Sequence, residues 1–290
     1  MKNYANNAFI VSNASRSIIE SMTEADYATH LQATGVEVLF HRNRYWRKTS
    51  HGFYEPIHWL ARLKLAQATA PTPLCWGFRA VLSKEDAHLA NGSLPIHLLT
   101  DLQNYKLQSL SASRRKNVRK CYRRSTVIRL RNSGLLKEQG YAVFSSASER
   151  TAHEPLLSKE HYLSKLPSCQ GNTQLVLAGL IEGKLGGYVI GYAVDGVAYI
   201  HDVRIASEAF SSCVGIGLIF EFIQICRHSQ QIYEISYGLH SREDKSLCSF
   251  KAGMGFSVKY VPTVVQINLL AARLIQWRYP DKYYRLTGYA

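Results

Sequence analysis

Three mainly apolar runs separated by short polar turns lie between residues 173 and 205, which predicts three consecutive β-strands. The strands are TQLVLAGLI, GGYVIGYAV and VAYIHDVRI, and the dipeptide Asp195-Gly196 between the last two is a typical hairpin turn. The apolar stretch at 215–226 (GIGLIFEFIQIC) then predicts a buried helix. A strand at 232–237, a helix at 245–252 and a strand at 256–261 complete this part. Strands joined through a helix are expected to be parallel neighbours, so the pattern predicts an α/β fold with a mixed sheet flanked by helices.

The rest of the chain has a weaker pattern. Residues 21–24 (Ser-Met-Thr-Glu) predict a helix start, and residues 36–40 alternate as a strand does. The further expected elements are a short helix at 54–65, a helical stretch at 101–124, strands at 126–130 and 142–147, a polar helix at 148–166, and a helix at 264–277. This reading divides the chain into an N-terminal α+β portion (1–104), a central α/β domain (105–262), and a C-terminal helix with a tail (263–290).

Composition indicates a globular protein, because 46% of the 290 residues are hydrophobic and 19% are charged. The sequence has no run of about 20 apolar residues and no secretory pattern at its start, so a cytoplasmic protein is expected. The six cysteines form no CxxC pair. We therefore expect free thiols and no metal site, since Cys226 and His228 lack a second ligand pair with zinc spacing.

Positive charge is concentrated in one segment. The formal net charge is +14, and residues 114–131 contain nine Lys or Arg and no acid. Three interpretations stay open: a solvated helix face, a platform for tRNA or another polyanion, and contact with an anionic membrane surface. The candidate anion-binding residues are Arg114, Arg115, Lys116 and Arg119.

The junction at 212–217 (Ser-Cys-Val-Gly-Ile-Gly) leads directly into the apolar helix. Glycines allow the backbone to approach a ligand, and free N–H groups at a helix N-terminus favour a phosphate. Packing of glycine against a neighbouring element is the alternative. The order of a strand meander, a GxG helix, a strand, a helix and a strand is similar to the GNAT superfamily of acyltransferases.

That family binds acyl-CoA through a (Gln/Arg)-x-x-Gly-x-(Gly/Ala) loop, and Ser212 stands here at the Gln/Arg position. The resemblance implies acyl-CoA as co-substrate and no permanently bound cofactor. The donor-binding residues that it implies are Val203, Ser212, Cys213, Val214, Gly215, Ile216 and Gly217. One interpretation of the N-terminal α+β portion is a partial or second GNAT-like subdomain.

Two further motifs resemble the FemAB-like branch of GNAT-type enzymes. These are YGLH at 237–240 followed by SLCSFKAGMGF at 246–256, and the basic helix SASRRKNVRKCYRR followed by TVIRL. The resemblance covers roughly residues 105 to 262. It implies an aminoacyl-tRNA donor as an alternative to acyl-CoA.

Lys251, within the second motif, is the first catalytic candidate, because a positioned ammonium stabilises an oxyanion or contacts donor phosphate. His240 and Asp202 are candidates for the base that deprotonates the amine acceptor. His201 and Asp202 are expected on opposite sides of their strand. No Cys or Ser has an evident paired base, which disfavours nucleophilic catalysis.

The sequence therefore predicts an N-acyltransferase that acts by direct attack without a covalent enzyme intermediate. The alternatives are a FemAB-like aminoacyltransferase using charged tRNA, and an inactive GNAT-like module that binds RNA or an acidic partner.

Overall fold

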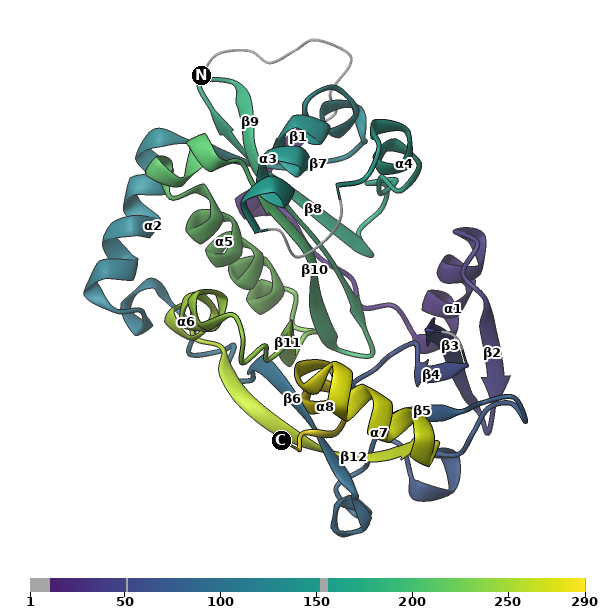
Figure 1. The fold of residues 1–290 in the computed structure, drawn as a ribbon. Helices are drawn as coiled ribbons and strands as arrows, with labels where there is room; N and C mark the ends of the chain where they lie inside the picture. The colour runs from purple at the N-terminus through teal and green to yellow at the C-terminus, as the bar shows by residue number, and fades with distance from the viewer. Residues whose placement is uncertain (1–10, 51, 152–155, 290) are drawn as a thin grey trace. The chain divides into compact units, whose positions relative to one another are not determined.

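The computed structural model describes residues 11–50, 52–151 and 156–289, which form two compact units (Figure 1). The first unit comprises Met1–Ser21, Leu99–Ser236 and Gly253–Gly255, and the second comprises Met22–Leu98, Tyr237–Ala252 and Phe256–Ala290. Neither unit is a contiguous range, whereas the sequence-based division into 1–104, 105–262 and 263–290 assumed contiguous parts. The assignment of an acyltransferase domain to residues 105–262 stays a prediction.

The sheet of the first unit contains the predicted meander. Its strands lie in the order β1 (Val11–Asn13), β7 (Thr126–Leu130), β8 (Gln174–Ile181), β9 (Lys184–Val194), β10 (Val197–Ile205) and β11 (Glu234–Leu239). The first four pairings are antiparallel, and β10 pairs with β11 in parallel over Glu234 to Ser236. The mixed α/β sheet predicted from the pattern is therefore confirmed.

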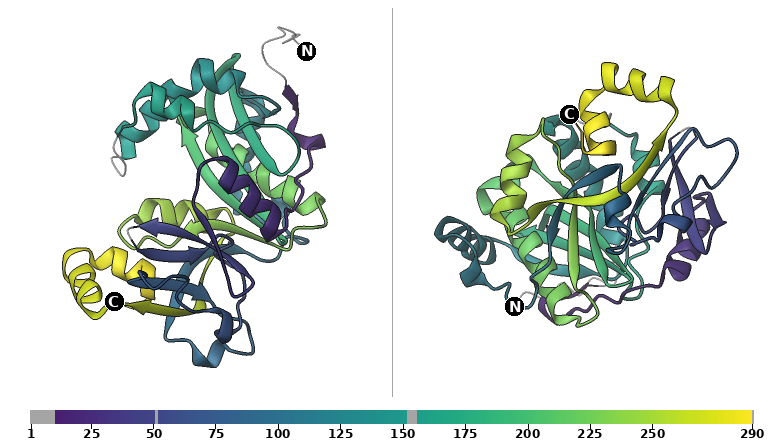
Figure 2. Two further views of the ribbon diagram at one scale, coloured as in Figure 1. Left: turned by 90° about the vertical axis from the view of Figure 1, so that its right-hand side faces the viewer. Right: turned by 90° about the horizontal axis from the view of Figure 1, so that it is seen from below.

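Helices cover both faces of this sheet (Figures 1 and 2). Helix α5 (Val214–His228) packs on one face, where a Cβ on Gly191 would meet the Phe222 ring at 2.4 Å, and α2 (Ala112–Arg124) lies against α5. Helices α3 (Tyr141–Thr151) and α4 (Lys159–Ser164) lie on the other face, where α3 packs against β9 and β10 and the Tyr162 ring of α4 lies against the Phe144 ring of α3. The shorter helical turns of this unit are Ala14–Arg16, Leu107–Ser109, Leu136–Gly140 and Ser207–Ser212.

The second unit is a mixed sheet with its own core. Its strands lie in the order β6 (Gly92–Leu99), β12 (Ser257–Ile267), β5 (Gly77–Val81), β4 (Phe53–Pro56), β3 (Arg44–Ser50) and β2 (Val38–His41), and the β4–β5 pair is parallel. Trp46, Leu63 and Phe78 are fully buried at the centre of one cluster. The last residues of β11 join this unit beside β6, where the His240 N–H donates to the Pro95 carbonyl at 2.9 Å.

Four α-helices are found among the described residues of the second unit. Helix α1 (Glu24–Ala33) begins where predicted, because Thr23 and Asp26 form a reciprocal capping box. Helix α6 (Lys245–Gly253) follows β11, and α7 (Leu269–Arg278) and α8 (Pro280–Thr287) follow β12 (Figure 2). Among the described residues, no helix is both long enough and apolar enough to cross a bilayer. Two short 3-10 turns lie at Leu65–Gln67 and Ala87–Leu89.

Several expected elements are wrong. Residues 142–147 belong to α3, because the buried side chains Val143, Phe144 and Ala147 share a helix face instead of alternating. The expected helix at 54–65 is strand β4 followed by turns, and its apolar residues are buried without a helical period.

Two expected helices have different boundaries. The stretch at 101–124 becomes helical only at Ala112, after the Ser111 cap. The stretch at 264–277 becomes helical only at Leu269, because β12 continues to Ile267 by pairing with β5. Of the polar helix expected at 148–166, residues 152–155 lie outside the described residues.

Candidate functional site

Lys251 is buried in the second unit, with only 5% of its surface exposed. It lies in the last turn of α6, where its Nζ donates to the Leu239 carbonyl at 3.2 Å and lies 5.1 Å from the centroid of the Tyr237 ring. Burial lowers the pKa of Lys251 to about 8, and Cys248 and Asp244 offset part of this shift. The side chain is therefore not a solvated helix lysine, and its charge is poised near neutral pH.

His240 lies in a cluster with His97 and Cys248, also within the second unit. Its Nδ1 lies 3.3 Å from His97 Nε2 and 3.3 Å from Cys248 Sγ, and the Cys248 thiol donates to the Ser241 carbonyl at 3.2 Å. Cys248 thus has a neighbouring imidazole, which corrects the expectation that no cysteine lies beside a base.

Both histidines of the cluster favour the neutral form. Burial, together with Lys251 and His240, lowers the pKa of His97 to about 4. Burial, and then Lys251 and Arg242, lower the pKa of His240, while Glu243 raises it. At neutral pH these imidazoles present lone pairs and can accept a proton or bind a cation.

Asp202 lies in the first unit, on β10. Its carboxylate pairs with Arg204 at 2.8 Å, and the Arg204 guanidinium lies 4.9 Å from the centroid of the Phe144 ring. The register between β9 and β10 shifts between Ile200 and Asp202, so His201 is the extra residue of a β-bulge.

The bulge corrects the expected orientation of these two residues. His201 lies against the Tyr192 ring, while Asp202 interacts electrostatically with Tyr188. Tyr192 and Tyr188 are four residues apart on β9 and share a face. His201 and Asp202 are therefore on the same side of the sheet, and the prediction of opposite sides is wrong.

The glycine junction begins α5 of the first unit. Cys213 has a left-handed backbone (φ 59°), and its carbonyl accepts the N–H groups of Ile216 and Gly217 at 3.1 and 3.2 Å. Val214 and Gly215 precede these first helical donors, so their N–H groups point out of the helix start, where an anion is favoured.

Both glycines of the junction also contact neighbouring side chains. A Cβ on Gly217 would lie 2.1 Å from Cys121 Sγ, and one on Gly215 would lie 3.2 Å from Ile205 Cγ1. Ser212 is buried, and Val203 is half-buried on β10. Packing therefore explains Gly217, and the predicted donor-binding role of residues 203 and 212–217 stays a prediction.

Helix α2 divides the predicted basic residues into two groups. Arg115 donates to the Leu110 carbonyl at 2.6 Å, and the Arg114 guanidinium packs within 3.0 Å of the Cβ position of Gly253. Lys116 and Arg119 are exposed, and Arg123 continues the same helix face one turn later. Val118 and Cys121 occupy the opposite, buried face. An anion would therefore contact the exposed group of Lys116, Arg119 and Arg123. Arg123 was not among the residues predicted from the sequence.

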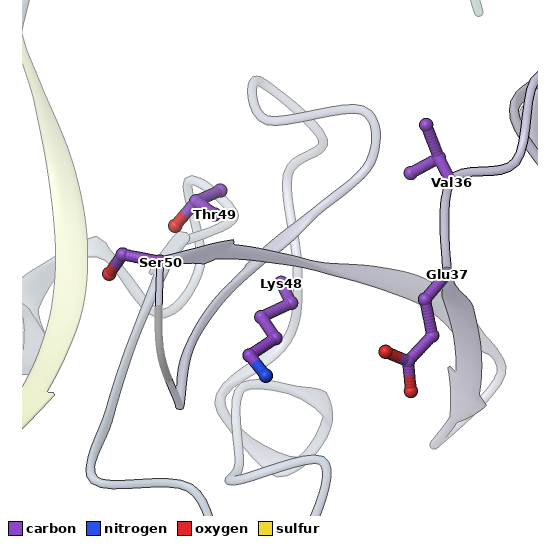
Figure 3. A pocket seen from close by; sticks show the side chains of 5 residues that line it. All are labelled: Val36, Glu37, Lys48, Thr49 and Ser50. Atoms are coloured by element: carbon purple, nitrogen blue, oxygen red, sulfur yellow. The ribbon is translucent and has the colours of Figure 1, made fainter.

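The described hollows of the second unit contain none of the predicted site residues. One is lined by Val36, Glu37, Lys48, Thr49 and Ser50, with the Lys48 and Glu37 side chains on neighbouring segments (Figure 3). Another is lined by Arg44, Arg62, Lys64, Gln67, Ser83, Lys84 and Glu85. Near the second hollow, burial and the charges of Arg44 and Arg62 lower the pKa of His58 to about 3.

No protein-family model matches the chain, and no curated protein matches it in sequence. Solved structures do resemble it over most of its length. FemX aligns with a TM-score of 0.60 at 10% identity, covering 91% of this chain and 96% of that one. The C-terminal domain of a protein assigned as a lysylphosphatidylglycerol synthetase from Agrobacterium fabrum aligns at 0.58 and 15% identity, covering 91% and 97%. L-PGS from Bacillus licheniformis aligns at 0.51 and 12% identity, covering 95% and 100%. The chain therefore has a fold like that of FemX, as the FemAB-like motifs predicted.

Proposed function

We propose that this chain transfers an acyl or aminoacyl group to an amine. The observation that carries the proposal is the buried Lys251 beside the end of β11, with a pKa lowered to about 8, next to two imidazoles that are neutral at physiological pH. Perturbed ionisable groups gathered in this way are typical of acid–base and electrostatic catalysis. The fold shared with FemX and with a lysylphosphatidylglycerol synthetase domain supports the same class of reaction.

In the proposed reaction the amine nitrogen attacks the carbonyl carbon of the donor. The Lys251 ammonium stabilises the oxyanion, the ester or thioester bond breaks, and the leaving group takes the bonding electrons. His240 accepts the proton that the attacking amine loses. Asp202 is the weaker candidate for this base, because its carboxylate is already engaged in an ion pair with Arg204 at 2.8 Å.

The exposed face of α2 favours aminoacyl-tRNA as the donor. Lys116, Arg119 and Arg123 recur at intervals of three and four residues, which aligns three cationic side chains along one side of the helix. Such a row suits a phosphate backbone. Acyl-CoA is the second candidate, supported by the N–H groups at the start of α5, although the side of Gly217 is already filled by Cys121.

The donor is tested by binding bulk tRNA to the purified chain over a range of salt concentrations. Changing Lys116, Arg119 and Arg123 together to Gln should weaken binding and reduce the salt slope by about two to three units, at roughly 0.7 to 0.9 per phosphate contact. The matched control changes Lys159, Lys165 and Lys184 to Gln, which removes the same charge from other exposed positions of the first unit. Equal losses in the two triple variants would refute the role of α2.

Transfer itself is tested with aminoacyl-tRNA and, separately, acyl-CoA against a panel of amine acceptors, with mass detection of the product. Lys251→Met should lose product formation while tRNA binding is retained. A wild-type chain that binds tRNA but consumes neither donor would instead be a binding module, and the enzymatic proposal would fail.

A further inference from the structure

We infer that His97, His240 and Cys248 form a binding site for a divalent transition metal, with zinc the best fit. One ligand atom of each residue lies within 4.8 Å of the other two. The three residues come from β6, from the end of β11 and from α6, all in the second unit.

The spacing of these atoms matches a metal's inner ligand sphere. Zinc binds imidazole nitrogen at about 2.0–2.1 Å and thiolate at about 2.3 Å, so neighbouring ligands of a tetrahedral ion lie roughly 3.3–3.6 Å apart. His240 Nδ1 lies 3.3 Å from His97 Nε2 and 3.3 Å from Cys248 Sγ. Two of the three distances between ligand atoms therefore already match those around a bound zinc ion.

Without a metal, the cluster is held by hydrogen bonds: His240 Nδ1 shares one hydrogen with His97 Nε2, and the Cys248 thiol donates to the Ser241 carbonyl. Once the thiol releases its proton, the three atoms each have a lone pair directed to a shared neighbourhood, which a cation can bind.

The choice of metal follows from the ligand types. Two imidazoles and one thiolate form a mixed nitrogen and sulfur set that suits zinc, whereas calcium and magnesium prefer oxygen ligands. His97 is almost fully buried, while His240 and Cys248 are partly accessible, which leaves a route for the ion. Three protein ligands leave a fourth position open, as in zinc sites that bind a water or a substrate oxygen.

The metal and the proton transfer proposed above would compete for His240, because a neutral imidazole has a single lone pair to offer. Any part that the metal plays in group transfer rests on the proposed function, whereas metal binding does not. The experiment therefore reads binding alone.

The test titrates Co²⁺ into the full chain after removal of bound metal with a chelator. We expect one Co²⁺ per chain, with a thiolate-to-metal charge-transfer band and intense d–d bands of a tetrahedral ion, and competition by Zn²⁺. Cys248→Ser should abolish the charge-transfer band, and His240→Gln should weaken Co²⁺ binding at least tenfold.

Cys75→Ser is the matched control, since Cys75 is also a partly exposed free thiol of the second unit. It should leave the spectrum and the affinity unchanged. Circular dichroism of the metal-free variants establishes that they are folded, and His97→Gln provides a further variant where Cys248→Ser does not fold. A Co²⁺ spectrum without the charge-transfer band, or one unaffected by both Cys248→Ser and His240→Gln, overturns the inference.

Discussion

Replacing Gly217 by alanine is expected to destabilise the first unit, because the place of the new methyl group is already taken. The added Cβ would lie 2.1 Å from Cys121 Sγ and 2.9 Å from Cys121 Cβ. Cys121 is fully buried, and its Sγ lies 3.1 Å from Ser125 Oγ. Rotating the thiol relieves the first contact only, so α2 and α5 must separate.

The magnitude follows from two opposing effects. Overpacking a tight contact costs about 1–3 kcal/mol, and a contact this short belongs at the upper end. Exchanging glycine for alanine inside a helix returns about 1 kcal/mol. The net loss is therefore about 2 kcal/mol, which lowers the melting temperature by roughly 4–8 °C in a protein of this size.

Urea unfolding followed by circular dichroism and tryptophan fluorescence measures this loss. Gly215→Ala is the matched control, because its Cβ meets Ile205 Cγ1 only at 3.2 Å, and we expect stability equal to or slightly above that of the wild type. Removing the opposing side chain with Cys121→Gly should make the double variant more stable than the sum of the single effects by about 1–2 kcal/mol.

A Gly217→Ala protein as stable as Gly215→Ala would refute this reasoning. The result also matters for the donor. If a bulky Gly217 variant loses CoA binding, the loss can be attributed to the phosphate contact only after the variant is shown to be folded.

Three further outcomes are expected. Burial lowers the pKa of Lys251 from 10.5 to about 8, so between these two pH values the folded chain binds fewer protons at Lys251 than the unfolded chain. The free energy of unfolding should therefore rise with pH across this window, and urea titrations of Lys251→Met should lack the rise. Since burial and two guanidinium groups lower the pKa of His58 to about 3, its contribution is lost as the pH falls from about 6.5 towards 3, and His58→Gln should flatten this acid limb. Arg129 donates to the carbonyls of Ile18 and Gly171 at 2.7 Å each, so Arg129→Met should lower the free energy of unfolding by about 2–4 kcal/mol, measured by thermal unfolding. A loss below about 1 kcal/mol would show that these two hydrogen bonds do not stabilise the first unit.

The sequence predicted the part of the fold in which pattern and turn chemistry agree. The strands β8, β9 and β10 are apolar runs bounded by short glycine-containing turns, and they form within a few residues of their predicted boundaries. Prediction failed where an apolar run is short. Residues 142–147 contain too few turns to separate the helical period from the strand period, and burial against the sheet decides the outcome.

The candidate site could be predicted from the sequence only in part, for a different reason. Lys251 and His240 were found because they lie within short motifs, and the structure places both in the second unit. His97 is 143 positions from His240 in sequence, and it reaches the cluster only through the placement of β6 beside β11. No local spacing encodes such a contact. Likewise, the bulge at His201 depends on pairing with β9 and was not visible in β10 alone.

The arrangement of the second sheet imposes a delay on the chain as it is synthesised. Strand β6 is almost entirely buried, yet its partner β12 ends about 170 residues later in the chain. At roughly 5–20 residues per second, a ribosome needs about 8–35 s to supply that partner. During this interval the edge of β6 that β12 later covers lacks its native partner, and an unpaired strand edge is open to pairing with other chains.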